Sequence, residues 1–173
     1  MINILTSFYI AHFNSNNNSQ RNDELKQCLN NNLNNNLIEK IHLYIDDNEA
    51  LEYIKSLNNS KINIIKVGFK PLYSDFFSYA LNNLQNKICM ITNSDIYLDE
   101  CDTKLLNKLD NNTVYSLTRY EYDMSSPLID KYEGSHDCFI FKSPIIIIQI
   151  TIILHKMLIL ILMRFLHHII HKT

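Results

Sequence analysis

The sequence has very little glycine, because only Gly68 and Gly134 occur in its 173 residues. Two isolated glycines exclude the glycine-rich loops of the Rossmann and P-loop nucleotide sites, which need several glycines at fixed spacing. A phosphate group in this chain would therefore have to be held by side chains and a cation rather than by a glycine-rich backbone loop.

Cysteine and excess positive charge are also scarce. The four cysteines show neither CxxC spacing nor the density of a disulfide-rich secreted module, so reduced thiols are expected. With 16 basic and 18 acidic residues, the formal net charge is −2, and the chain lacks the basic excess of a nucleic-acid-binding protein. The opening segment "MINILTSFYIAHF" has no basic region or cleavage site of a signal peptide. We therefore expect a cytoplasmic protein with no nucleic-acid partner.

What the sequence does contain is an alternation of apolar strand-like and helix-like segments. Strands are predicted at residues 2–8, 38–46, 61–67, 87–93, 113–120 and 138–142. Helices are predicted at residues 21–33, 47–57, 71–84 and 102–109, with Asp47 as a cap and Pro71 in a first turn. This alternation predicts one α/β domain over residues 1–144, with a mostly parallel sheet covered by helices on both faces.

Polar residues stand where three of these strands end. The first strand ends in "TSF", the fourth in "TNSD" and the fifth in "TRYE". Because ligands of parallel sheets collect at the carboxyl ends of the strands, these segments are expected to converge on one site.

The fourth of these endings carries the most specific chemistry. Asn93 and Asp95 are two residues apart, so in an extended strand their side chains would project to the same side. Amide and carboxylate oxygens are the ligands of a hard divalent cation, which could bridge the protein to a phosphate. Taken alone, an acid such as Asp95 in a turn after a strand is a structural cap or turn residue more often than a metal ligand.

The order of these segments resembles the GT-A-fold glycosyltransferases. The matching blocks are "NILTSFY", a helix opened by Arg21 and Glu24, "DFFSYA", "NSDIYLDE", "SLTRYE" and "SHDCFIFK". They are similar to glycosyltransferase-like proteins of bacteria and giant viruses, and the resemblance covers roughly residues 1–144. It implies that Asp95 belongs to a DxD-like motif that binds Mn²⁺ or Mg²⁺ on the diphosphate of a nucleotide sugar. Asn93 departs from the usual acid of that motif and lowers the expected metal affinity.

The resemblance also implies roles for two residues near the last strands. Asp137 is the candidate general base that deprotonates the acceptor hydroxyl, and the alternative is a residue that simply starts a strand. Arg119 is a candidate for bidentate binding of phosphate, and the alternative is a surface ion pair with Glu121 or Asp123.

Four further candidates complete the expected nucleotide site. Thr6 and Ser7 either contact the nucleoside or satisfy backbone groups at a strand end. Arg21 is either a second phosphate contact or a solvated helix start, and Asp75 is a modest candidate beside aromatic residues of the core.

The composition changes abruptly at the C-terminal tail, residues 145–173. This apolar tail carries Lys156 near its middle, and a central lysine costs about 2.5–3.5 kcal/mol on insertion scales. The apolar runs on either side are shorter than the roughly 20 residues that a membrane span needs. We expect a tail that is not native to the fold, and membrane contact through it is the less favoured alternative.

Three functions remain open from the sequence. The first is a glycosyltransferase that uses a nucleotide-diphosphate sugar, and the second is an inactive, truncated remnant of such an enzyme. The third is another nucleotide-binding transferase on a similar sheet.

Overall fold

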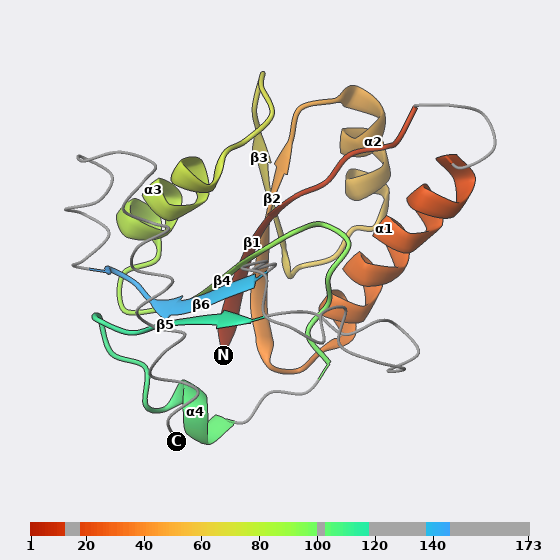
Figure 1. The fold of residues 1–173 in the computed structure, drawn as a ribbon. Coiled ribbons are helices and arrows are strands. Elements are labelled where there is room, and N and C mark those ends of the chain that lie inside the picture. The colour runs from red at the N-terminus through yellow and green to blue at the C-terminus, as the bar shows by residue number, and fades with distance from the viewer. Residues whose placement is uncertain (13–17, 100–102, 118–137, 146–173) are drawn as a thin grey trace, which may run out of the picture.

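The computed structural model describes residues 1–12, 18–99, 103–117 and 138–145. These residues form a six-stranded sheet with helices on both faces (Figure 1). The strands are β1 (Ile2–Ser7), β2 (Ile38–Ile45), β3 (Ile62–Lys66), β4 (Ile88–Thr92), β5 (Val114–Leu117) and β6 (Cys138–Lys142). The helices are α1 (Asn18–Asn34), α2 (Asn48–Ser56), α3 (Tyr73–Asn83) and α4 (Thr103–Leu106). Within the described ranges, no helix combines the length and apolar character that a bilayer span requires.

The predicted order of strands and helices is confirmed, with differences at the ends of elements. Asp47 caps α2 as expected, because its carboxylate accepts a hydrogen bond of 2.6 Å from the backbone N–H of Ala50. Pro71 was placed wrongly in the first turn of α3. That helix begins at Tyr73 with Leu72 as its N-cap, so Pro71 lies two residues before the first residue of the helix. The fourth helix is also shorter than predicted.

The sheet has the strand order β3-β2-β1-β4-β6-β5. Strand β1 runs parallel to β2 and β4, and β2 runs parallel to β3. Strand β6 is antiparallel to both of its neighbours, β4 and β5. The expected α/β fold with a mostly parallel sheet is therefore confirmed, and the sheet is mixed because β6 runs against the others.

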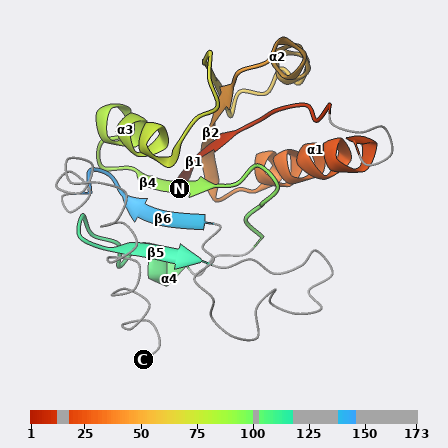
Figure 2. The same ribbon diagram turned by 45° about the horizontal axis from the view of Figure 1, so that its top comes forward.

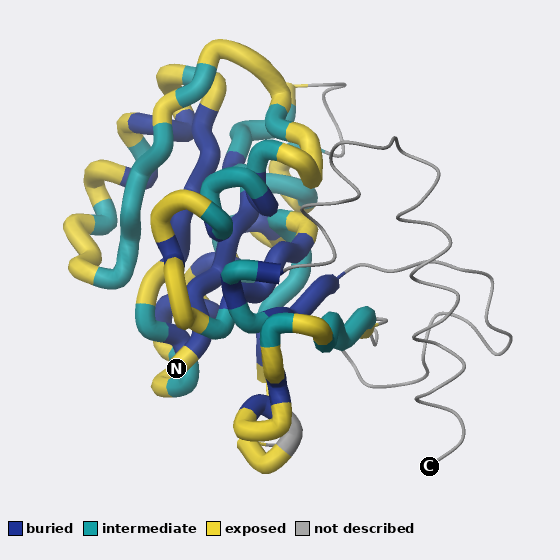
Figure 3. The backbone as a smooth tube through the Cα atoms, turned by 90° about the vertical axis from the view of Figure 1, so that its left-hand side faces the viewer, coloured by how far each residue is buried: buried dark blue, intermediate teal, exposed yellow. Residues whose placement is uncertain are grey.

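The sheet separates two apolar cores, and alternate residues of β1 enter opposite ones. Ile2 and Ile4 pack in the core formed with α1 and α2, whereas Leu5 packs in the core formed with α3. The helices contribute buried side chains at helical spacing, among them Leu25, Leu29 and Leu33 of α1. Figure 2 shows α1 and α2 on one side of the sheet and α3 on the other. Among the described residues, β1, β2 and β4 consist mainly of buried residues, and Figure 3 shows the buried segments gathered in the interior.

A row of polar side chains crosses three strands beneath α3. His42 of β2 lies between Asn3 of β1 and Asn63 of β3, with ring-nitrogen distances of 3.4 Å to Asn3 Oδ1 and 3.0 Å to Asn63 Nδ2. Asn63 also donates to the hydroxyl of Tyr79 on α3, at 3.0 Å. Asn3 in turn donates to Glu39 at 3.1 Å. Buried polar groups cost stability unless they are paired, and this row pairs them across the sheet.

The first residue of the predicted C-terminal tail belongs to the core. Ile145 is only 4% exposed and packs with Phe141 in the core beneath α3. The rest of the predicted tail, residues 146–173, lies outside the described residues.

Candidate functional site

The strand order places a topological switch point between β1 and β4. Strands β2 and β3 follow β1 in the chain and lie to one side of it within the sheet. The next strand in the chain, β4, pairs with the opposite edge of β1. In open α/β sheets, ligands bind outside the carboxyl ends of the strands at such a point. Here those ends are Ser7 of β1 and Thr92 of β4.

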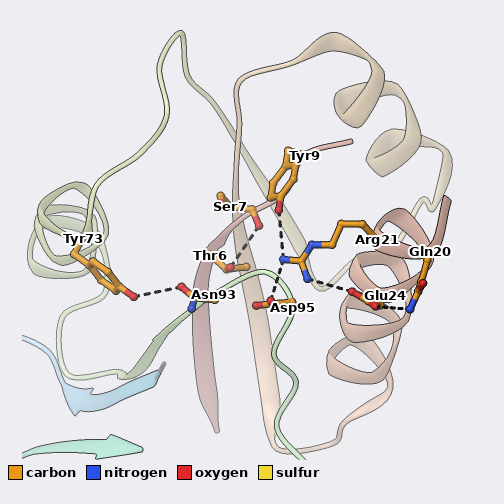
Figure 4. A network of polar contacts seen from close by, with 9 residues as sticks. All are labelled: Thr6, Ser7, Tyr9, Gln20, Arg21, Glu24, Tyr73, Asn93 and Asp95. Atoms are coloured by element: carbon orange, nitrogen blue, oxygen red, sulfur yellow. Dashed lines mark hydrogen bonds and ion pairs between the residues drawn. The ribbon is translucent and has the colours of Figure 1, made fainter. Parts of the chain in front are cut away.

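An ion pair lies at this edge of the sheet. Arg21, near the start of α1, places Nη2 2.9 Å from Oδ2 of Asp95, which follows β4. The same guanidinium donates to Glu24 Oε2 at 3.2 Å and to the hydroxyl of Tyr9 at 3.4 Å. Figure 4 shows the guanidinium between these three partners, which come from α1, the segment after β1 and the segment after β4. Two of the predicted site residues, Arg21 and Asp95, are therefore brought together from 74 positions apart.

Asparagine side chains hold the segment after β4 against α1. Asn32 is 4% exposed, and its amide donates to the carbonyl of Ile96 and accepts from the backbone N–H of Leu98, each at 3.0 Å. On the other side, Asn22 accepts from the backbone N–H of Ala11 at 2.7 Å, which fixes the segment after β1. These contacts position Asp95 and Tyr9 on either side of Arg21.

Burial, together with the hydrogen bonds and charges of this cluster, shifts the pKa values of two groups. Burial lowers the pKa of Arg21, but the hydrogen bonds with Tyr9 and Asp95 and the charge of Asp95 outweigh burial and raise it overall. Arg21 is consequently a permanent cation. Burial and then the negative charge of Asp95 raise the pKa of the Cys28 thiol to about 11, so this thiol stays protonated near neutral pH.

Asn93 and Asp95 do not project side by side as the sequence spacing suggested. Strand β4 ends at Thr92, and a turn follows in which the N–H of Ile96 donates to the carbonyl of Asn93 at 3.3 Å. The alternation of an extended strand therefore does not apply. Asn93 Oδ1 accepts from the Tyr73 hydroxyl at 3.3 Å, whereas Asp95 turns to Arg21 (Figure 4).

Thr6 and Ser7 lie at the end of β1, between the Asn93 and Arg21 contacts (Figure 4). Thr6 is 6% exposed, and its hydroxyl contacts the carbonyl of Ser7 at 3.4 Å. This is the backbone role that was the structural alternative for Thr6. Ser7 is the more accessible of the two and borders the switch point.

Asp75 has a structural role at the start of α3. Its carboxylate accepts a hydrogen bond of 2.7 Å from the backbone N–H of Leu72, and its carbonyl accepts from the Tyr44 hydroxyl at 3.3 Å. The carboxylate contact accounts for an acid in the first turn of α3 without a ligand.

Arg119 and Asp137 lie outside the described residues, so the structure does not place them. Sequence reasoning did not select Tyr9 or Tyr73, and it treated Glu24 only as part of the resemblance. The three-residue spacing of Arg21 and Glu24 on one helix was the available signal for Glu24.

The donor atoms at Asp95 suit a hard divalent cation, but only in part. Within the described ranges, no three His, Cys, Asp or Glu side chains gather in a group that could hold a metal ion. Asp95 offers a carboxylate, and its Oδ2 is engaged by Arg21. A Mn²⁺ or Mg²⁺ ion here would have to compete with Arg21 and take further oxygen ligands from a bound phosphate.

The chain matches no known protein-family model and no curated protein.

Proposed function

We propose that the chain binds a nucleotide-diphosphate sugar at the carboxyl ends of β1 and β4 and transfers the sugar to an acceptor, as GT-A-fold glycosyltransferases do. The observation that carries the proposal is the Arg21–Asp95 pair at the switch point, because it places a cation suited to phosphate beside a carboxylate suited to a divalent metal. The strand–helix order that underlies the resemblance agrees with the proposal.

In this proposal each residue has a defined task. Arg21 binds the diphosphate through its planar guanidinium. Asp95 would hold Mn²⁺ or Mg²⁺, and the bound ion would supply Lewis-acid chemistry for the diphosphate leaving group. Ser7 borders the nucleoside, and Asp137 deprotonates the acceptor hydroxyl.

Calorimetric titration with UDP and GDP, each with Mn²⁺ or with a chelator, tests the binding step. We expect binding with Mn²⁺ and at least about tenfold weaker binding with chelator, which is about 1.4 kcal/mol. Asp95→Asn keeps the shape of the side chain but removes its charge, and it should weaken the metal-dependent binding by a similar factor. Asp23→Asn, which removes an exposed acid from the same helix as Arg21, is the matched control and should bind as the wild type does.

Equal affinity with Mn²⁺ and with chelator would overturn the metal role of Asp95. No binding of any nucleotide diphosphate would overturn the proposal as a whole. Release of nucleotide diphosphate from a bound nucleotide sugar then separates an active transferase from a remnant that binds its donor without turning it over.

A further inference from the structure

The carboxylate of Asp95 already has a cation as its partner. Its side chain is 23% exposed, and Oδ2 lies 2.9 Å from Arg21 Nη2. A charge-assisted hydrogen bond of this length between partly shielded groups is stronger than a solvent-exposed ion pair. The oxygen that a divalent cation would bind is therefore already in contact with the positive charge of Arg21, which repels the cation.

The Arg21 guanidinium has two contacts besides the one with Asp95. Nη1 is held by Glu24 at 3.2 Å, and the Tyr9 hydroxyl lies 3.4 Å from Nη2. The Arg21 side chain is 35% exposed, so an incoming ligand can reach it. A diphosphate offers the planar guanidinium two oxygens at once, which allows the bidentate contact that arginine prefers.

We propose that Arg21 holds Asp95 in the ligand-free protein and exchanges this carboxylate for the diphosphate of the incoming nucleotide, so that Asp95 accepts a divalent cation only together with the nucleotide. This inference rests on the proposed function and adds the order in which the site is filled. Glu24 keeps the guanidinium beside the site during the exchange. The ligand-free protein consequently has little affinity for the metal alone.

The exchange makes metal and nucleotide binding cooperative. By linkage, the factor by which the nucleotide raises the affinity for the metal equals the factor by which the metal raises the affinity for the nucleotide. Direct contact between metal and phosphate contributes to this coupling in any variant. The part due to Arg21 should disappear when its charge is removed.

Titration of Mn²⁺ alone, followed by the paramagnetic resonance signal of the unbound ion, measures the first consequence. We expect Arg21→Gln to bind Mn²⁺ about tenfold more tightly than the wild type, which corresponds to about 1.4 kcal/mol. Lys55→Gln is the matched control, because it removes the same charge from an exposed pair with Glu52 on α2. It should bind Mn²⁺ as the wild type does. Arg21→Lys, which keeps the charge but loses the planar fork, should fall between wild type and Arg21→Gln.

Titration of UDP in the presence and absence of Mn²⁺ measures the second consequence. The coupling factor in Arg21→Gln should be about tenfold smaller than in the wild type, and binding of UDP without metal should be weaker. The thermal unfolding midpoint of each variant shows whether it is folded. Equal Mn²⁺ affinity in folded wild type and Arg21→Gln, or an unchanged coupling factor, would overturn the exchange.

These outcomes are distinguishable from failure of the proposed function. If the wild type binds UDP with Mn²⁺ and Arg21→Gln shows no gain in Mn²⁺ affinity, the nucleotide site stands and the exchange is wrong. If the wild type binds neither UDP nor GDP with Mn²⁺, the proposed function is wrong and the exchange falls with it.

Discussion

Mild acid should destabilise this protein through one buried histidine, His42. In the neutral tautomer with hydrogen on Nε2, the ring donates to Asn3 Oδ1 and accepts from Asn63 Nδ2. A second proton would sit on Nδ1 and face the amide N–H groups of Asn63, so the protonated ring loses that hydrogen bond. The ring is also only 5% exposed, which leaves little water to solvate a charge.

The direction and size of the effect follow from the pKa of His42. Burial lowers this pKa from 6.5 to about 4, the charge of Lys40 adds to the effect, and the charge of Glu39 opposes it. Because the folded-state pKa lies below the unfolded one, the stability from the neutral ring is complete above pH 6.5 and is lost as the pH falls toward 4. Between pH 7 and pH 5 this amounts to roughly 2 kcal/mol of unfolding free energy.

Urea unfolding of wild type, His42→Gln and His12→Gln at pH 7 and pH 5 tests this reasoning. The His42→Gln variant should lose much less stability than the wild type between the two pH values, even if it is less stable at both. His12, whose side chain is 60% exposed in its pair with Glu49, provides the control that should behave as the wild type. The hydrogen bond with Lys87 lowers the pKa of Glu39, so this carboxylate stays ionised in the folded protein at pH 5. Measuring no lower than pH 5 therefore keeps most of the pH-dependent stability due to Glu39 out of the comparison.

The reasoning is refuted if His42→Gln retains the full loss of stability on going to pH 5. A loss that disappears in His12→Gln instead would assign the pH dependence to an exposed group.

Two further predictions concern the capping residue of α2 and the thiols. Asp47→Ala should lower the unfolding free energy by about 1 kcal/mol, because the N–H of Ala50 loses its partner. Glu52→Ala, which removes only an exposed pair on the same helix, should cost well under that in the same urea titration. Burial is the main cause that raises the pKa of Cys28 to about 11 and that of Cys89 to about 12. Because only the thiolate reacts, both thiols should react slowly with iodoacetamide at about pH 7.5. Peptide mapping should show both thiols modified rapidly once the protein is unfolded, and rapid labelling of Cys28 in the folded state would contradict its described environment.

The identity and order of the elements could be predicted because they depend on local patterns. Strand β1 is a short apolar run, and α1 repeats leucine at helical spacing, so each could be assigned from its own residues. The position of β6 between β4 and β5 could not be predicted, because pairing between distant segments leaves no periodic signal in a single sequence. Local propensity also does not determine whether a late strand runs parallel or antiparallel to its neighbours.

For the candidate site, the residue types could be predicted better than their contacts. Arg21 and Asp95 were each selected, but their contact depends on Asn32, which fixes the segment after β4 to α1. The prediction that Asn93 and Asp95 project to the same side was wrong, because β4 ends at Thr92 and both residues lie in the turn that follows. Side chains in a turn do not alternate as they do in a strand. Such boundaries are set by tertiary contacts, which the sequence alone does not show.

The position of β6 also has a consequence for folding during synthesis. Once residues 1–117 have emerged from the ribosome, β1 to β4 can form their parallel pairs, but β4 exposes an edge and β5 has no described strand beside it. Residues 138–142 must emerge before β6 can fill the space between them. Until then the unpaired edge of β4, which carries apolar residues, can pair with another chain. Stalled or shortened chains that end before Cys138 should therefore be more prone to aggregation than chains that reach Lys142.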